Sequence, residues 1–146
     1  MTRVVATGVF EILHPGHIMF LTEAKKLCNG GELIVILARD ENIKKHKRSI
    51  IIPENQRLGV IKALAVVDFA VLGDKMDMFR PILEINPDII ALGPNQKFDE
   101  NELKKKLRER YMNVGVVRIK KFWEGEGDEL NSTRGIIDRI KKEGDK

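Results

Sequence analysis

The sequence is poor in cysteine and in aromatic residues, and each shortage excludes a class of protein. Cys28 is the single cysteine, so the chain can form neither an internal disulfide framework nor a multi-cysteine zinc site. This cysteine usage is typical of a protein of the reducing cytoplasm, which is where we expect it. The aromatic content is 5%, too little for the stacking platforms that bind single-stranded nucleic acid.

Long apolar runs and two kinds of glycine-rich loop are also absent. No apolar run approaches the roughly 20 residues that span a bilayer, so no membrane association is expected. The N-terminus leads directly into a predicted strand, and no secretory signal is expected. That strand is followed by Gly-Val-Phe-Glu-Ile-Leu instead of G-x-G-x-x-G, which argues against a dinucleotide dehydrogenase. A Walker A loop is missing as well, which argues against a P-loop nucleoside triphosphatase.

The remaining composition is that of one globular domain covering residues 1–146. Of these residues, 42% are hydrophobic and 33% are charged, and the formal net charge is +4. The excess positive charge lies partly in Lys44–Arg48 and partly in Lys104–Arg110. The second run includes glutamates at helical spacing and is interpreted as a solvated helix face. No nucleic acid partner is therefore expected.

Strand and helix patterns alternate along the chain. Strands are predicted over about 3–7, 32–38, 69–72, 88–93 and 114–119. Helices are predicted from Pro15, from Pro53, over about 76–85, from Asp99 and from Ser132, and Pro81 favours a late start or a kink in the third of these. Residues 39–52 and 120–131 are predicted as polar loops. Alternation with short connections favours an α/β fold. We expect a single Rossmann-like, doubly wound domain, with a five-stranded parallel sheet and helices on both faces.

Ligands of such sheets bind beyond the carboxyl ends of the strands, where the segment Gly8–His17 leaves the first strand. Its imidazoles, His14 and His17, are three residues apart and lie on one face of the first helical turn. Unpaired backbone N–H groups and the positive end of the helix dipole attract anions to this turn. The segment therefore predicts a polyphosphate site, whereas a single histidine at such a junction is often only a capping residue.

The segment resembles the H-x-G-H signature of the nucleotidyltransferase superfamily, which includes cytidylyltransferases, phosphopantetheine adenylyltransferase and archaeal FAD synthases. Family members usually open with Gly-Thr-Phe-Asp, and Gly8-Val-Phe-Glu11 departs at two positions. Two further segments resemble the archaeal FAD synthase branch: Pro53-Glu-Asn-Gln-Arg57 and Leu92-Gly-Pro-Asn-Gln-Lys-Phe-Asp-Glu100. The resemblance resumes at Ser132-Thr133, which match the helix start where family members bind nucleotide phosphates.

The resemblance implies direct nucleotidyl transfer, in which an oxygen of a phosphate monoester attacks the α-phosphorus of a nucleoside triphosphate and pyrophosphate leaves. No nucleophilic side chain is required, because positioning and charge stabilisation supply the catalysis. The catalytic residues implied are His14 and His17, with Lys45, Lys47 and Arg57 as further cations. A guanidinium such as that of Arg57 can grip a phosphate in a fork.

The resemblance also implies ATP and FMN as substrates and FAD as product. The alternative is a cytidylyltransferase that uses CTP and glycerol 3-phosphate or a related small phosphate ester. A third hypothesis is a nucleotide-binding protein without turnover, which Glu11 in place of Asp would permit. A homodimer is the expected assembly.

The nucleotide-binding residues implied by the resemblance surround the H-x-G-H segment and include Asn95, expected at the base or ribose. Phe122 or Trp123 could stack on an adenine or a flavin, and a core position is the alternative for both. Mg²⁺ or another divalent cation is expected with the nucleotide and without a protein metal cage. Glu11 and Asp40 are expected to contact it only indirectly. The full nucleotide-binding set is Val9, Phe10, His14, Pro15, Gly16, His17, Asn95, Phe122, Trp123, Ser132 and Thr133.

Overall fold

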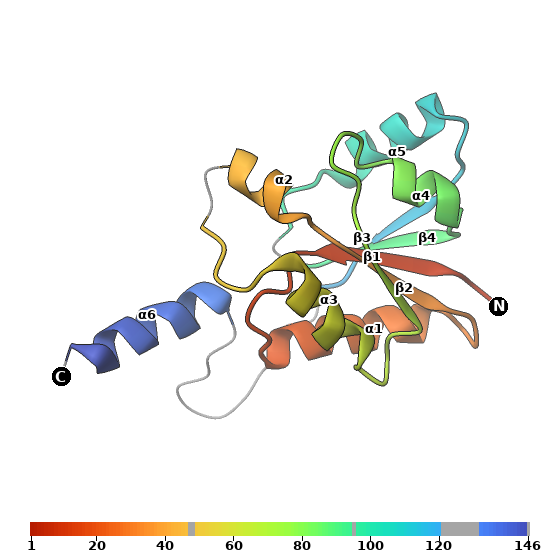
Figure 1. The fold of residues 1–146 in the computed structure, drawn as a ribbon. Helices are drawn as coiled ribbons and strands as arrows, with labels where there is room; N and C mark the ends of the chain where they lie inside the picture. Colours follow the sequence, from red (N-terminus) through yellow and green to blue (C-terminus); the bar gives the residue numbers. More distant parts are fainter. Residues whose placement is uncertain (47–48, 95, 121–131, 146) are drawn as a thin grey trace.

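The computed structural model describes residues 1–46, 49–94, 96–120 and 132–145, and in them strands and helices alternate (Figure 1). The strands are β1 (Val4–Gly8), β2 (Leu33–Leu37), β3 (Phe69–Leu72), β4 (Ile89–Leu92) and β5 (Gly115–Arg118). The helices are α1 (Pro15–Leu27), α2 (Asp40–Lys45), α3 (Glu54–Lys62), α4 (Arg80–Ile85), α5 (Glu100–Glu109) and α6 (Thr133–Gly144).

The strands form one parallel sheet in the order β3-β2-β1-β4-β5. The central strand is β1, where Val5 pairs with Ile34 of β2 on one side and with Ile90 of β4 on the other. The chain builds outward from β1 to β3 and then returns to add β4 on the opposite side of β1. Ligands of doubly wound sheets bind at this reversal, beyond the carboxyl ends of the strands. The expected fold class is confirmed.

Helices cover both faces of the sheet, with α1 and α3 on one face and α4 and α5 on the other (Figure 1). Side chains of β1 alternate between two apolar clusters: Val4 packs with Leu21 of α1, whereas Val5 packs with Leu103 and Leu107 of α5. Because both faces are buried, the inner strands are continuous apolar runs, and every residue of β2 is buried.

Two helices begin later than the sequence pattern predicts, and one predicted loop contains a helix. The predicted helix over about 76–85 begins at Arg80, because the carboxylate of Asp74 accepts backbone hydrogen bonds from Met76 (2.8 Å) and Asp77 (2.9 Å) and forms a turn. The helix expected from Pro53 begins one residue later, at Glu54, with Pro53 as its N-cap. Residues 39–52, predicted as a loop, contain α2.

The terminal helix α6 is capped as predicted, since the Ser132 Oγ accepts a hydrogen bond from the Gly135 N–H at 3.0 Å. Its apolar residues, however, are not part of the core. No residue of α6 is buried, and Ile140 is 62% exposed. In Figure 1 the helix extends away from the sheet. The amphipathic pattern predicted a helix correctly but did not determine its packing.

Candidate functional site

His14 and His17 form a reciprocal capping box at the start of α1. His14 is the N-cap residue, and its Nδ1 accepts a hydrogen bond from the Gly16 N–H at 3.0 Å. The Nδ1 of His17 accepts one from the His14 backbone N–H at 3.3 Å. Pro15 occupies the first helical position, where its missing N–H would have had no partner in the helix. Capping uses the Nδ1 atom of each ring and leaves the Nε2 atom outside the cap.

The capping bonds fix the tautomer of both histidines. An Nδ1 atom that accepts a hydrogen bond carries no proton, so the neutral ring carries its proton on Nε2. Burial lowers the pKa of His14. Burial, and then the neighbouring His14, lowers the pKa of His17 to about 4. The ring centroids are 3.9 Å apart, and at neutral pH two adjacent neutral rings therefore present Nε2–H donors.

Phe10 supports this pair from the core and does not line an open surface. Its ring is 5% exposed and contacts the rings of His17 (centroids 5.5 Å apart) and Phe20 (6.5 Å). Its backbone is left-handed (φ 51°), which turns the ring back over Gly8. A Cβ on Gly8 would lie 2.7 Å from that ring, so glycine is needed there. Phe10 thus supports His17, and its expected nucleotide contact stays a prediction.

The pKa of His17 predicts an acid sensitivity of folding. The folded-state pKa of about 4 lies below the ordinary value of 6.5, so the stability due to neutral His17 is complete above pH 6.5. That stability is lost as the pH falls from 6.5 toward 4. A fully buried group would lose about 3 kcal/mol, and partial exposure reduces the expected loss to about 1–2 kcal/mol.

Urea unfolding of the wild type and of His17→Gln between pH 4 and pH 7 measures this loss. Glutamine at the third helical position can also reach back to the N-cap N–H, so the capping box is kept without a titrating group. Subtracting the variant removes the contribution of carboxylates that titrate in the same range. If the free energies of unfolding of the two proteins change with pH in parallel, the lowered pKa of His17 would be contradicted.

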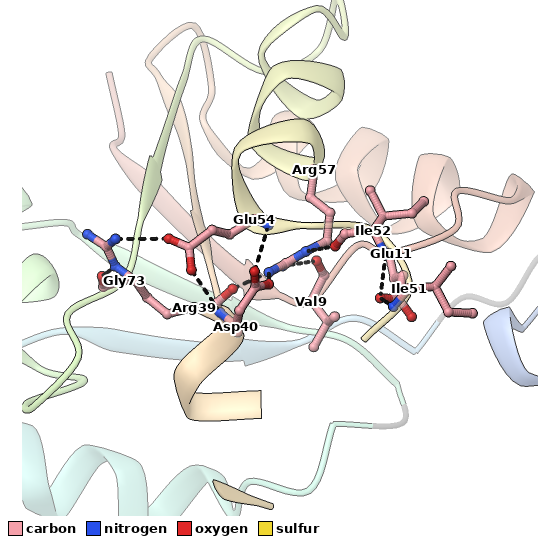
Figure 2. A network of polar contacts seen from close by, with 10 residues as sticks. Val9, Glu11, Arg39, Asp40, Ile51, Ile52, Glu54, Arg57 and Gly73 are labelled. Atoms are coloured by element: carbon pink, nitrogen blue, oxygen red, sulfur yellow. Dashed lines mark hydrogen bonds and ion pairs between the residues drawn. The ribbon is translucent and has the colours of Figure 1, made fainter. Parts of the chain in front are cut away.

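A buried arginine, Arg57 of α3, ties the turn before α1 to the segment after β2 (Figure 2). Its side chain is fully buried. The guanidinium donates to three backbone carbonyl oxygens, those of Ile52 (3.0 Å), Val9 (2.9 Å) and Ala38 (2.9 Å). It also donates to a carboxylate oxygen of Asp40 at 2.6 Å. The donors of Arg57 thus face protein acceptors, which gives it a positioning role in this structure; the phosphate contact expected from the sequence stays a prediction.

The network continues from Asp40 to the rim of the sheet. The second carboxylate oxygen of Asp40 accepts from the Glu54 N–H at 3.2 Å, and Glu54 in turn accepts from Arg39 at 3.0 Å. Arg39 also donates to the carbonyl of Gly73, at the end of β3 (2.7 Å). Burial would raise the pKa of Asp40, but hydrogen bonds from Arg57 and the Glu54 backbone lower it below its ordinary value. Asp40 is therefore ionised at neutral pH and is held by these two donors.

Glu11, the departure from the usual family opening, is a second tie between these segments. It is 6% exposed, and one of its carboxylate oxygens accepts from the backbone N–H groups of Ile51 (2.7 Å) and Ile52 (3.2 Å). Figure 2 shows Glu11 and Arg57 on either side of Ile52. The segment that follows α2 is thus anchored directly to the turn before α1.

Of the two lysines expected to contact phosphate, the structure describes Lys45 but not Lys47. Lys45 is the last residue of α2, and its ammonium lies 3.4 Å from the carbonyl oxygen of Lys75 in the segment after β3. This contact is long and exposed. Lys47 lies outside the described residues, as do Asn95, Phe122 and Trp123, so their expected roles stay predictions.

Arg118 organises the segment between β4 and α5, a feature that we did not infer from the sequence. It donates to the carbonyl oxygens of Gly93 and Gln96, both at 2.9 Å, and also to that of Phe98 and to the Glu100 carboxylate. The Nε2 of Gln96 donates back to the Thr7 carbonyl at the end of β1 (3.1 Å). An arginine within the apolar strand Gly115–Arg118 was the available signal for such a role.

The start of α6 is brought against the H-x-G-H segment. The hydroxyl of Thr133 donates to the carbonyl oxygen of Ile12 at 3.1 Å, although 121 residues separate the two in sequence. Ser132 and Thr133 therefore lie beside the turn that leads into His14. The Nε2–H groups of the two histidines, the positive end of the α1 dipole and this second helix start are therefore brought together, which suits a bound polyphosphate.

An apolar hollow of about 530 Å³ lies beside His14 on the outer side of α1 and is lined by residues between 13 and 22. Within the described residues, no group of three or more His, Cys, Asp or Glu side chains is arranged to hold a metal ion. None of the helices described is both long and apolar enough to cross a membrane.

Comparison with known proteins gives concordant matches. A family model with the description "Cytidylyltransferase-like" matches residues 5–139. A FAD synthase from Archaeoglobus profundus is 57% identical over 140 residues, which cover 96% of this chain and 86% of that protein. A FAD synthase from Methanoculleus marisnigri is 56% identical over 140 residues, covering 96% of this chain and 89% of that one.

Solved structures show the same fold. A protein of Thermoplasma volcanium described as a lipopolysaccharide core biosynthesis protein superposes with a TM-score of 0.80 at 48% identity, covering 85% of this chain and 99% of that one. A pantoate-beta-alanine ligase from Francisella tularensis superposes with a TM-score of 0.61 at 16% identity, covering 93% of this chain and 65% of that one. The second likeness concerns the fold alone.

Proposed function

The chain belongs to the cytidylyltransferase-like family, and on that basis we propose that it is an FMN adenylyltransferase, which joins ATP and FMN to give FAD and pyrophosphate. Two kinds of support converge. Relatives at 50–57% identity are named FAD synthase and match over most of their length. The single structural observation that carries the proposal is the pair of neutral imidazoles whose Nε2–H groups lie outside the capping box.

The reaction that fits this site is an in-line displacement at phosphorus. An oxygen of the FMN phosphate forms a bond to the α-phosphorus of ATP, and the bond from that phosphorus to the β-phosphate oxygen breaks. Pyrophosphate leaves with the electron pair. His14 and His17 donate their Nε2–H groups to the phosphate oxygens on which negative charge increases. Their lowered pKa values keep them neutral donors and prevent mutual repulsion of two imidazolium ions.

Other residues hold the substrates in place. The positive end of the α1 dipole, together with Ser132 and Thr133 at the start of α6, favours the phosphates of the nucleotide at this place. Lys45 and Lys47 are proposed to add positive charge for the same phosphates. Arg57, Asp40 and Glu11 keep that segment against the turn before α1, so their contribution is to positioning.

A divalent cation enters with the nucleotide. The described residues offer no cluster of metal ligands, and the carboxylates considered from the sequence, Glu11 and Asp40, accept hydrogen bonds from backbone N–H groups and from Arg57. This donor set fits a Mg²⁺ ion that is held by phosphate oxygens and water and belongs to the substrate rather than to the protein.

Product analysis tests the proposed function. Purified protein is incubated with ATP, Mg²⁺ and FMN, and FAD and pyrophosphate are quantified together. Equal amounts of the two products are expected. A parallel reaction with CTP and glycerol 3-phosphate tests the alternative transferase. Turnover in the second reaction without FAD in the first would overturn the FMN assignment, and no turnover in either would indicate a binding protein.

Asn95 is proposed to contact the nucleotide base or ribose, where an amide supplies both a donor and an acceptor. We expect Asn95→Ala to reduce the preference for ATP over CTP by about 1–3 kcal/mol, because a buried polar group of the nucleotide loses its partner. The ratio of kcat/KM values for the two nucleotides measures this preference. An unchanged ratio would remove Asn95 from the base site.

The proposed assembly is a homodimer in the cytoplasm. Within the described residues the edge strand β3 pairs with β2 alone, and it leaves Phe69 (56%) and Val71 (39%) exposed. Val60 of α3, the helix packed next to β3, is 51% exposed as well. An apolar edge of this kind is suited to contact a second copy of the chain. Sedimentation of the purified protein should give the mass of two chains.

A further inference from the structure

A second hollow lies at the carboxyl edge of the sheet, on the face covered by α4 and α5. Its volume is about 240 Å³, and its walls come from two separate segments, Met78–Phe79 before α4 and Lys97–Lys106 leading into α5. We propose that this hollow binds the isoalloxazine ring of FMN. The inference rests on the function proposed above and adds to it a location for the ring of the acceptor.

The side chains that line the hollow match the two halves of a flavin ring. Met78 and Phe98 are partly exposed large apolar residues, one on each wall. A planar ring between them would stack on the phenyl group and contact the polarisable thioether. The pyrimidine half of a flavin carries two carbonyl oxygens and an N–H group. Lys97 and Lys106 can donate to such oxygens, and Glu102 can accept from the N–H.

Both walls are held in place by arginines before any ligand arrives. Arg118 donates to the backbone carbonyl of Phe98, and Arg110 donates to the Asp77 carboxylate at 2.7 Å. The Arg110 guanidinium also lies 4.6 Å from the centre of the Phe79 ring. Binding a rigid ring between walls that are already ordered costs little conformational entropy.

The hollow is within reach of the phosphate site. The wall that carries Phe98 follows β4, and β4 is hydrogen-bonded to β1, so the two strand ends lie about 5 Å apart. Gln96 joins this wall to the Thr7 carbonyl, immediately before the segment Gly8–His17. We infer that the ribityl chain of FMN, with five carbons, crosses the end of β4 from the hollow toward the segment that carries the two histidines.

The larger hollow beside His14 fits a flavin ring less well. Among the described residues, its lining comes from one segment, Leu13 to Thr22. Its lining is almost entirely apolar and provides few partners for the pyrimidine half. A planar ring buried on both sides needs lining from more than one segment, and the hollow that Met78 and Phe98 share is lined by two separate segments.

Steady-state kinetics of the full chain test the assignment. Phe98→Ala and Met78→Ala should each raise the KM for FMN, by about tenfold for Phe98, and leave the KM for ATP within twofold. Phe98→Leu, which keeps apolar volume without the aromatic face, should recover only part of the loss. Tyr111→Asn is the matched control, because Tyr111 is 99% exposed and has a positive φ that asparagine tolerates.

Three outcomes would overturn the proposal that this hollow binds the flavin ring. An unchanged KM for FMN in Phe98→Ala is the first, and a parallel rise in the KM for ATP, which a distorted Gly93–Phe98 segment would cause, is the second. The third is a larger effect from Ile18→Ala in the hollow beside His14, or from Phe122→Ala or Trp123→Ala. Quenching of riboflavin fluorescence keeps the two proposals distinguishable, because riboflavin has the ring without the phosphate. If riboflavin binding depends on Phe98 but the protein makes no FAD, the proposed flavin site is retained and the proposed enzyme activity is overturned.

Discussion

Replacing His14 with asparagine is expected to lower kcat about 10²-fold and to leave stability close to that of the wild type. Asparagine is a favourable N-cap residue, so its side-chain oxygen can take over the hydrogen bond that His14 Nδ1 accepts from the Gly16 N–H. It cannot present a donor where the Nε2–H of the imidazole lies. Removing one preorganised donor from a site where negative charge develops typically lowers kcat by about this factor.

The companion variant His17→Gln follows the same logic, because glutamine retains the bond to the His14 N–H and loses the outer donor. Initial rates of FAD formation at saturating ATP and FMN give kcat, and urea unfolding gives the stability. His14→Ala serves as the contrast: it removes the cap as well and should cost about 1 kcal/mol of stability in addition to activity. A His14→Asn protein with near-normal kcat would show that the pair only caps α1.

The largest effect on stability is expected from Arg57→Met. Methionine fills much of the same space but leaves the ionised Asp40 and the carbonyls of Val9, Ala38 and Ile52 without their donor. Removing one partner of a buried ion pair typically costs about 3–5 kcal/mol. Arg57→Lys should recover only part of this, because one ammonium group cannot reproduce a planar fork with acceptors on several sides.

Urea unfolding at pH 7 measures the loss, and Arg134→Met is the matched control. Arg134 pairs with Asp138 on the exposed surface of α6, so its replacement should change stability by less than about 0.5 kcal/mol. If Arg57→Met retains wild-type stability and only raises the KM for ATP, the network of Figure 2 is not structural and Arg57 is a substrate ligand after all.

Local rules explain why so much was readable from the sequence. The order of strands and helices, the helix start at Pro15 and the caps at Asp99 and Ser132 depend on contacts within a few residues. The pairing of His14 with His17 is equally local, since an N-cap residue and the third helical position always face each other. A fold made of such alternating units then follows from the handedness of its crossovers.

The sequence by itself therefore determined the fold class and the pairing of the two imidazoles at the start of α1. Only the tertiary structure decided the role of Arg57, because three of its four acceptors are backbone carbonyl oxygens, which every residue possesses and no side-chain pattern reveals. The same reason applies to Arg118 and the wall that carries Phe98. It was likewise the packing of Phe79 and Ile82 with Leu103 and Leu107, across long stretches of sequence, that brought Met78 and Phe98 to one hollow.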